Sequence, residues 1–217
     1  YQLTIERIEF RGKLFDSASV FMLLIGIWAL AAVIFLSQRF TLARKDLAQA
    51  KQQKQVWEKK ATLDPLTGAV NRIGAHKAFA KQIYSANKSD DFSIIFMDID
   101  HFKRINDALG HGVGDKILKQ FVQVLRKNIR DSDMIVRWGG EEFILICHNT
   151  ALNPAVRLAE KLRAVIQVEP WSEAVVMTSS FGVAQMCDES LERFIERADL
   201  ALYSAKNNGR NCVVPAP

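Results

Sequence analysis

Three carboxylates stand at positions where a carboxylate is costly to bury. Asp98 lies near the end of the apolar stretch Phe92–Ile99, and Glu141 and Glu142 directly precede the apolar run that begins at Phe143. Side chains alternate along a strand, so Asp98 shares a face with apolar residues of its own stretch. An ionised carboxylate in such surroundings is unfavourable unless a positive charge pairs with it. The three acids therefore indicate a site that binds cations.

The turn before the two glutamates is typical of a β-hairpin. The stretch reads R-W-G-G-E-E-F, and Gly139 and Gly140 accept the positive φ angles of a tight turn. This pattern predicts strands at Met134–Trp138 and Glu142–Cys147. If the hairpin lies beside the strand that carries Asp98, the acids of the two segments converge at one edge of a sheet.

Two convergent carboxylates suit a magnesium ion that keeps open positions for phosphate oxygens. Two such ions can hold the attacking and leaving oxygens of a phosphoryl transfer. For Asp98 two structural roles stay open, which are capping of the strand end and an ion pair with Lys103 or Arg104. The residues alone favour phosphoryl transfer without excluding a structural pair.

Predicted helices and strands alternate around these acids. This order is typical of an α/β (α+β) fold in which helices flank a central mixed, mainly antiparallel sheet. At the start of the region, Asp64 before Pro65 predicts a helix N-cap with proline at the first helical position. The other predicted elements are strands at Phe92–Ile99, Ala174–Gln185 and Asn211–Val214, and helices at Phe102–Leu109, from about Lys116 to Ile129, at Pro154–Val168 and at Leu191–Lys206.

An uncharged apolar stretch, Ser17–Gln38, precedes this region. It has the roughly 20 residues that a membrane-spanning helix needs. A buried core helix and a signal peptide are the alternatives. However, a core helix rarely stays apolar on all sides, and a signal peptide has a shorter apolar core. We therefore expect one transmembrane helix that anchors the protein in a membrane.

Basic residues gather on the C-terminal side of this span, between Arg39 and Lys60, whereas the charges before it are balanced. An excess of Lys and Arg marks the cytoplasmic side of a membrane, which predicts a cytoplasmic C-terminal domain. Much of the net charge of +5 is then a juxtamembrane feature, and nucleic acid is not an expected partner. The cysteines show no paired spacing, which fits a reducing compartment.

The stretch Phe40–Ala61 predicts a polar helix. Residues spaced by four and three positions form a weak seam of the coiled-coil type: Ala43, Leu47, Ala50, Lys54, Trp57 and Ala61. A solvated linker helix explains the pattern equally well. In the first interpretation, residues 39–61 are a juxtamembrane signalling helix that holds two copies side by side. Because the chain begins with Tyr1, we expect residues 1–16 to be the end of a sensor region of a longer protein.

The region from Thr62 to Val214 contains five linked motif stretches: D-P-L-T-G-A-V-N-R (Asp64–Arg72), F-M-D-I-D-H-F-K-R-I-N-D (Phe96–Asp107), G-H-G-V-G-D (Gly110–Asp115), R-W-G-G-E-E-F (Arg137–Phe143) and A-L-Y-S-A-K-N-N-G-R-N (Ala201–Asn211). In these stretches, and in their order and spacing, the region closely resembles the GGDEF domains of diguanylate cyclases. The resemblance implies a nucleotide-cyclase or palm-like fold over residues 62–217. It also implies an enzyme that joins two GTP molecules into cyclic di-GMP and releases two pyrophosphates, with one GTP on each domain of a homodimer.

The resemblance assigns roles to the acids. Asp98, the backbone carbonyl of Ile99 and Glu141 are the implied ligands of Mg²⁺, with Mn²⁺ as the alternative metal. Glu141 and Glu142 are the implied catalytic residues, and Glu141 helps to deprotonate the 3′-hydroxyl. Glutamate replaces the usual aspartate at position 141, and Ala69 stands where the family usually has leucine. Neither departure affects the expected metal site.

The resemblance also implies how the nucleotide is bound. Asn106 and Asp115 match the residues that read guanine, because a carboxylate accepts the paired donors of guanine's Watson–Crick edge, which adenine lacks. For Asp115 an N-cap is the structural alternative, and both roles can hold. The other implied substrate-binding residues are Lys103, Phe102, His101, Lys206 and Arg210, of which the last two alternatively complement a helix C-terminus.

Arg130 and Asp133 match the family's R-x-x-D inhibitory site, where arginine binds phosphate or guanine and aspartate accepts from guanine. A charged helix end followed by a turn is the structural alternative. The expected protein is thus a diguanylate cyclase in the inner (cytoplasmic) membrane of a bacterium, regulated by a sensor and by its product. A non-catalytic cyclic di-GMP receptor that uses the R-x-x-D site, and a purely structural output module, are the competing functions.

Overall fold

The computed structural model describes the backbone of residues 2–85 and 91–217, which form two compact units. The first ends at Trp57 and consists of most of helix α1 (Gln2–Thr62). The second, Glu58–Pro217, holds the remaining helices and strands. The expected transmembrane and linker segments both lie within α1, which runs through them without interruption.

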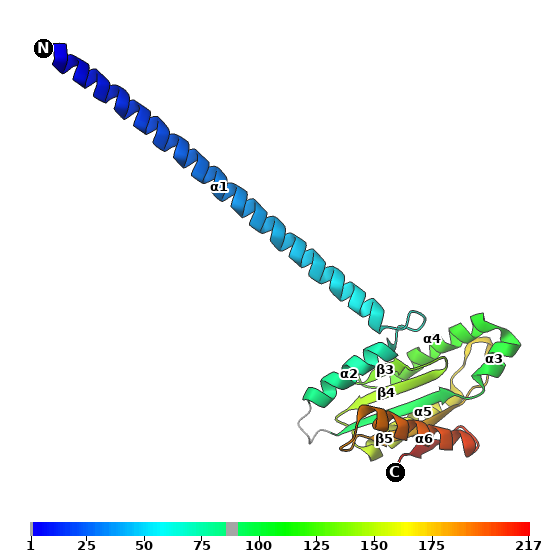
Figure 1. The fold of residues 1–217 in the computed structure, drawn as a ribbon. Coiled ribbons are helices and arrows are strands. Elements are labelled where there is room, and N and C mark those ends of the chain that lie inside the picture. Colours follow the sequence, from blue (N-terminus) through cyan, green and yellow to red (C-terminus); the bar gives the residue numbers. More distant parts are fainter. Residues whose placement is uncertain (1, 86–90) are drawn as a thin grey trace. The chain divides into compact units, whose positions relative to one another are not determined.

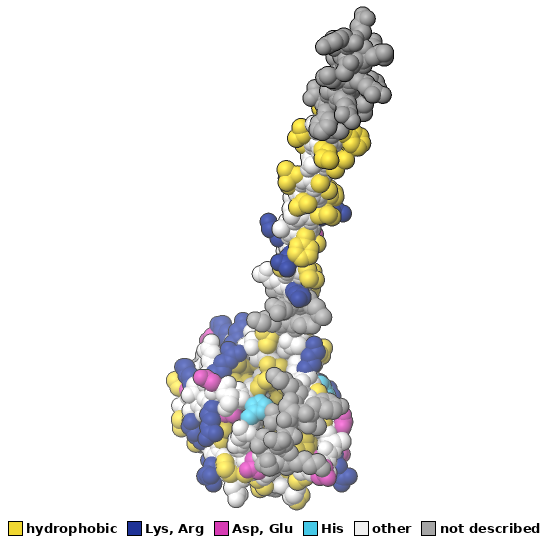
Figure 2. Space-filling view, turned by 90° about the vertical axis from the view of Figure 1, so that its left-hand side faces the viewer, with side chains coloured by type: hydrophobic (Ala, Val, Ile, Leu, Met, Phe, Trp, Pro, Cys, Tyr) yellow, Lys and Arg dark blue, Asp and Glu magenta, His cyan; other side chains and the backbone are white. Residues whose placement is uncertain are grey.

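Part of α1 is long and apolar enough to cross a membrane. This segment, Ser19–Gln53, reaches a mean hydropathy of 2.7, and no other described helix passes the same criterion. Large apolar side chains such as Phe21 and Trp28 are exposed. Figure 2 shows hydrophobic side chains along this segment, with Lys and Arg side chains in its C-terminal part. By length and composition α1 is a candidate span, and its membrane insertion stays a prediction.

The second unit is built around a six-stranded mixed sheet with the order β1-β3-β4-β2-β5-β6. The central pairs β3–β4, β4–β2 and β2–β5 are antiparallel, and the outer pairs are parallel. Helices flank this sheet, as Figure 1 shows, so the predicted fold class is confirmed. The strands are β1 (Val70–Asn71), β2 (Phe92–Ile99), β3 (Met134–Arg137), β4 (Glu142–His148), β5 (Ser179–Gln185) and β6 (Val213–Pro215), and the helices are α2 (Arg72–Ser85), α3 (Phe102–Leu109), α4 (His111–Asn128), α5 (Leu152–Val168) and α6 (Leu191–Asn207).

Strand β2 lies at the centre of the sheet, and all of its residues are buried. Its side chains alternate between two cores: Ile95 and Met97 pack with α4 and α5, whereas Ile94 and Phe96 pack with α2 and α6. Because helices cover both faces, the strand is apolar on both. Asp98 continues the second series and therefore shares a face with Phe96, as predicted.

The predicted helix start at Asp64 is wrong. The Asp64 carboxylate accepts hydrogen bonds from the N–H and the hydroxyl of Thr67, at 2.8 and 2.6 Å. An N-cap aspartate makes the same bond to the N–H three residues on, but here no helix follows it. The turn ends at Gly68, whose φ is 67°, and the next helix, α2, starts only at Arg72.

Two further predicted boundaries are wrong. Strand β5 begins at Ser179 rather than Ala174, because a short 3₁₀ turn precedes it and Glu173 and Ala174 both have positive φ. Helix α4 begins at His111, so Asp115 lies inside the helix and is not its N-cap. The structural alternative for Asp115 is thereby removed.

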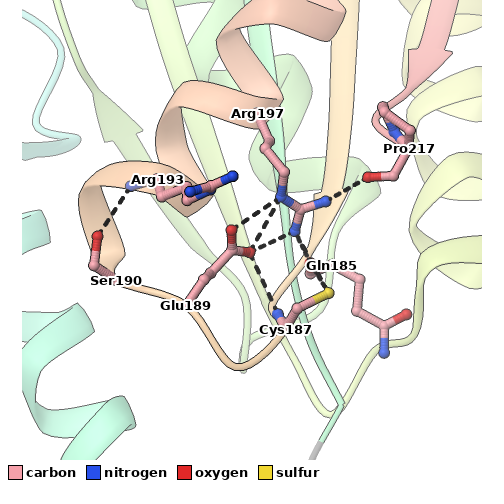
Figure 3. Close-up of polar contacts among 7 residues, drawn as sticks. All are labelled: Gln185, Cys187, Glu189, Ser190, Arg193, Arg197 and Pro217. Atoms are coloured by element: carbon pink, nitrogen blue, oxygen red, sulfur yellow. Dashed lines mark hydrogen bonds and ion pairs between the residues drawn. The ribbon is translucent and has the colours of Figure 1, made fainter.

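The first half of α6 is held by an ion pair between Arg197 and Glu189, drawn in Figure 3, in which Arg197 also donates to backbone carbonyls. Arg197 donates from Nε to Oε2 of Glu189 at 3.1 Å, and it also donates to the backbone carbonyls of Gln185 and Pro217. The hydrogen bond with Glu189 is the main reason why the pKa of Arg197 is raised. This cluster fastens the connection between β5 and α6.

Candidate active site

Asp98, Lys206 and the hairpin glutamates meet at the C-terminal end of β2. Lys206, in the last turn of α6, places its Nζ 2.8 Å from Oδ2 of Asp98. Strand β4 lies beside β2 and sets Glu142 directly opposite Asp98. The backbone carbonyl of Glu141 accepts from the N–H of Ile99 at 3.4 Å. The predicted convergence of Asp98 with the hairpin acids is confirmed.

The charge state of Asp98 reflects this setting. Burial raises its pKa from the ordinary value of 3.8 to about 6. Lys206 opposes the shift by its hydrogen bond and its charge, while the carboxylates of Glu141 and Glu142 add to it. The structural alternative of an ion pair with Lys103 or Arg104 is not what the described residues form, because Lys206 is the cation paired with Asp98. A buried carboxylate with two acidic neighbours and one cation favours a further positive charge.

Arg137 holds the hairpin turn in place. Its Nε and Nη2 donate to the carbonyl of Gly140 at 3.0 and 2.8 Å, and its Nη1 donates to both carboxylate oxygens of Asp64 at 3.1 and 3.2 Å. Burial opposes ionisation of Asp64, but hydrogen bonds from Thr67 and Arg137 together lower its pKa. The turn that carries Glu141 is thus tied to the first turn of the domain.

Asn106 and Asp115 lie on the consecutive helices α3 and α4. Within the described part of the chain, the buried Oδ1 of Asn106 has no hydrogen-bond partner. Gly114 makes room for this oxygen, because a Cβ at that position would collide with it. An unpaired buried acceptor is costly, and an N–H group of a ligand would satisfy it. Asp115 follows Gly114 and is exposed.

The other expected substrate-binding residues occupy different surroundings. His101 and Lys103 are exposed at the start of α3, and His101 has a φ of 58°. The side chain of Phe102 is buried in the core, so only its backbone is available to a substrate. Arg210 is exposed in the turn after α6 and has a φ of 66°.

Arg130 and Asp133 lie in the turn between α4 and β3. The carboxylate of Asp133 accepts from the backbone N–H of Arg130 at 3.1 Å. Both residues line a cavity of about 550 Å³ whose walls also include Lys127 and Lys161. Neither Asp98 nor the hairpin glutamates line this cavity, so the predicted inhibitory residues form a separate cluster.

Sequence reasoning missed Asp100. Its buried carboxylate accepts from the hydroxyls of Thr178 and Ser180, both at 2.7 Å, and from the backbone N–H of Asn211 at 3.1 Å. The available signal was the D-x-D spacing with Asp98, which arises easily by chance. The contacts that reveal its role come from Thr178 just before β5, from Ser180 on β5 and from the turn after α6, all far along the chain.

The donor atoms around Asp98 fit magnesium. Asp98 and Glu141 offer carboxylate oxygens and Ile99 offers a backbone carbonyl, which are the ligands that Mg²⁺ prefers. Among the described residues, no group of three or more His, Cys, Asp or Glu side chains is arranged to hold a metal by itself. That result agrees with two carboxylates and one carbonyl, because Mg²⁺ keeps positions for substrate phosphates and water.

A family profile described as "Diguanylate cyclase, GGDEF domain" matches residues 61–212. The chain belongs to the GGDEF family of diguanylate cyclases. All five motif stretches lie within the matched range, so the resemblance seen in the sequence is confirmed.

Curated relatives in the GGDEF family match the same region. The chain is 41% identical to diguanylate cyclase DgcP of Pseudomonas aeruginosa over 157 residues, which cover 70% of this chain and 23% of DgcP. It is 37% identical to diguanylate cyclase DgcM of Escherichia coli over 173 residues, which cover 79% of this chain and 42% of DgcM. It is 39% identical to response regulator PleD of Caulobacter vibrioides over 164 residues, which cover 71% of this chain and 36% of PleD. The chain thus spans less than half the length of these relatives.

Solved structures of GGDEF proteins share the fold. The coiled coil and GGDEF domain of DgcB from Caulobacter crescentus, in complex with c-di-GMP, gives a TM-score of 0.75 at 26% identity and covers 83% of this chain and 99% of that one. Diguanylate cyclase SiaD from Pseudomonas aeruginosa, in complex with its activator SiaC, gives a TM-score of 0.73 at 28% identity. The match covers 99% of this chain and 85% of the SiaD chain. These similarities confirm the predicted GGDEF fold.

Proposed function

We propose that the chain is a diguanylate cyclase, which condenses two GTP molecules into cyclic di-GMP and releases two pyrophosphates. The convergence of Asp98, Glu141 and Glu142 with Lys206 at the end of β2 carries this proposal. Family membership supports it, because the named relatives DgcP and DgcM are diguanylate cyclases.

The guanine base is read by Asn106 and Asp115 in this proposal. The exposed carboxylate of Asp115 accepts the N1–H and N2–H₂ donors of guanine. The unpaired Oδ1 of Asn106 gains a partner when a base N–H reaches it. Adenine presents an acceptor at N1, so ATP leaves the carboxylate unsatisfied and is rejected.

The triphosphate is bound by cations from two elements. Lys103 at the start of α3 and Lys206 and Arg210 at the end of α6 offset its charge. His101 and the backbone of Phe102 border the same position. As charge develops on the leaving pyrophosphate, these cations stabilise it more strongly than in the ground state.

The reacting groups lie at the hairpin. Asp98, the carbonyl of Ile99 and Glu141 would hold Mg²⁺ or Mn²⁺, which supplies neutralisation of phosphate charge. Glu141 accepts the proton of the 3′-hydroxyl of one GTP. The 3′-oxygen then bonds to the α-phosphorus of the second GTP, and the bond between that phosphorus and the leaving pyrophosphate breaks. Glu142 adds negative charge beside Asp98 and helps to retain the cations.

Two domains must face each other, because each holds one of the two GTP molecules. The homodimer that this requires is supported by the seam of α1, where Leu47 and Trp57 are exposed. We place the Ser17–Gln38 segment in the inner membrane of a bacterium, with the catalytic domain in the cytoplasm. A sensor that precedes α1 would then set the pairing of the two helices and so the activity.

A cyclic di-GMP receptor is the second candidate function. The cavity beside Arg130 and Asp133 favours it, since its volume of about 550 Å³ and its basic walls suit a dianionic dinucleotide. In the cyclase proposal the same cavity binds the product and restrains the enzyme. The intact hairpin with both glutamates supports the enzyme over a receptor alone.

The deciding experiment incubates the whole chain, in lipid nanodiscs that hold two copies, with GTP and Mg²⁺ and measures cyclic di-GMP by mass spectrometry. We expect product from the parent, none with ATP, and a loss of about 10²–10³-fold or more in Glu141→Gln. A folded, dimeric parent that makes no product but binds cyclic di-GMP through Arg130 would establish the receptor instead.

A further inference from the structure

Asp100 is the buried acid that the proposed chemistry does not use. Within the described residues it forms no ion pair, and three hydrogen-bond donors satisfy its carboxylate. The hydroxyl of Ser180 donates to Oδ1, while the hydroxyl of Thr178 and the backbone N–H of Asn211 donate to Oδ2. A buried carboxylate is costly, so a structure that retains one with this many donors uses it to hold something in place.

The segment that Asp100 holds is a strained turn. Gly209, Arg210 and Asn211 follow one another with φ angles of 104°, 66° and 46°. L-residues seldom adopt successive left-handed conformations unless their surroundings enforce them. The N–H of Arg210 donates to the carbonyl of Ala205 at 3.1 Å, which closes the end of α6. The next N–H, that of Asn211, donates to the carboxylate of Asp100.

The side chain of Asn211 has its own anchors on α5. Its Oδ1 accepts from Arg163 at 3.2 Å, and its Nδ2 donates to Gln167 at 3.3 Å. Asn211 is thus fixed through backbone and side chain alike, while the neighbouring Arg210 is exposed. The arrangement immobilises the backbone of Arg210 and leaves its guanidinium free to reach a ligand.

We propose that Asp100 is a positioning residue that fixes the Gly209–Asn211 turn and thereby aims Arg210 at the triphosphate; this inference rests on the proposed function. The two acids near the end of β2 then position two different cations at the end of α6. Asp98 forms an ion pair with Lys206, and Asp100 positions Arg210 by accepting a hydrogen bond from the backbone N–H of Asn211. Because the left-handed turn is held before substrate arrives, Arg210 loses little freedom when it binds phosphate.

The test uses the whole chain in nanodiscs and has two arms. Hydrogen exchange by mass spectrometry follows the backbone amides of residues 208–212. Affinity is measured for 3′-deoxy-GTP with Mg²⁺, which lacks the attacking hydroxyl and so does not react. Asp100→Ala should expose the turn to exchange and weaken the binding of 3′-deoxy-GTP by about tenfold. Arg210→Ala should weaken it to the same extent, because each variant loses one charge-assisted contact.

The double variant separates positioning from a general loss of structure. If Asp100 acts through Arg210, Asp100→Ala combined with Arg210→Ala binds 3′-deoxy-GTP no more weakly than Arg210→Ala alone. Asp100→Asn keeps one acceptor oxygen for Asn211 and should restore most of the affinity. Ser180→Ala is the matched control, since it removes a donor to the other oxygen of Asp100 and should leave affinity within about twofold of the parent.

The proposal is overturned if the losses of affinity for 3′-deoxy-GTP add up in the double variant. It is also overturned if residues 208–212 stay protected from exchange in Asp100→Ala. If Asp100→Ala does not fold, the same cycle is run with Asp100→Ser, which removes the charge and shortens the side chain while keeping a polar group for Thr178 and Ser180. A loss that persists when Arg210 is absent overturns the proposal. A parent that fails to bind 3′-deoxy-GTP overturns the proposed function and the phosphate role of Arg210. The exchange arm then still shows whether Asp100 holds the turn.

Discussion

The two halves of α6 each carry an ion pair, and the pairs differ in their surroundings. Arg197 has Glu189 and two backbone carbonyls as acceptors, so its donors are largely satisfied (Figure 3). The pair of Lys206 with Asp98 has two more carboxylates beside it, and the pKa of Asp98 is raised to about 6. The first pair stabilises a connection, whereas the second leaves negative charge in excess.

The contrast shows which kind of ion pair marks a functional site. Both pairs are partly buried, so burial and distance do not separate them. What separates them is the cost of the charges. The raised pKa of Asp98 means that the folded protein holds its ionised form at a cost, whereas the raised pKa of Arg197 means that the fold favours its charged form. Functional sites commonly carry such a cost. Substitutions in the two pairs should therefore have opposite effects on activity and stability.

The largest effect on activity is expected for Asp98→Asn. The amide cannot replace an anionic metal ligand, so cyclic di-GMP synthesis should fall by about 10²–10³-fold or more. At pH 8 without metal, the unfolding free energy should stay equal or rise, because a buried charge with a raised pKa is removed. Initial rates and thermal unfolding measure the two effects. A variant that is both destabilised and active would contradict the comparison.

Lys206→Met is expected to have the next largest effect. The side chain keeps its length but loses the charge, so the KM for GTP should rise by about tenfold. The pKa of Asp98 should rise further, because Lys206 opposes the effect of burial on it. Steady-state kinetics measure the KM, and the exposed Lys77→Met on α2 serves as the control. Equal KM changes in the two variants would show that Lys206 acts only through net charge.

The pH dependence of metal binding follows from the same acid. Because the folded pKa of Asp98 lies above 3.8, its stabilisation of the metal-free protein is present below about pH 4 and is lost as the pH rises through about 6. A metal displaces that proton, so its affinity should increase up to about pH 6 and level off above it. Calorimetric titration with Mn²⁺ from pH 5 to 8 measures this. A curve that is flat from pH 5 to 7 would place the metal away from Asp98.

Local pattern was sufficient to predict much of the fold and the acids of the site. Strand β2 has the predicted bounds, because an apolar run buried on both faces is unambiguous between turns. The hairpin followed from its glycines, and its place beside β2 brought Glu142 opposite Asp98. Family resemblance added the residues of the guanine and phosphate sites, whose roles stay predictions.

The errors arose where a distant segment or a competing local bond decides the outcome. For Asp98 the structural alternative was an ion pair with Lys103 or Arg104, its neighbours in sequence, but the fold places Lys206 of α6 beside it instead. Asp64 makes the hydrogen bond of an N-cap to Thr67, but the positive φ of Gly68 ends the turn before a helix forms. Asp100 was missed because its partners lie just before β5, on β5 and after α6. None of these contacts has a periodic signal.

The smallest effect on activity is expected for Arg197→Met, together with a clear loss of stability. Glu189, whose side chain is 10% exposed, loses its cation, and two backbone carbonyls lose their donor. The unfolding free energy should fall by about 2 kcal/mol, less than for a fully buried pair because Arg197 is partly exposed.

Activity per folded molecule should remain within about twofold, because no group at the end of α6 changes. Denaturant unfolding and rates at saturating GTP measure the two quantities, and Glu189→Gln in the Arg197→Met background should recover part of the stability, since it removes the orphaned charge. If activity falls with stability intact, the first half of α6 also governs the position of Lys206. The two ion pairs would then act as one unit along the helix.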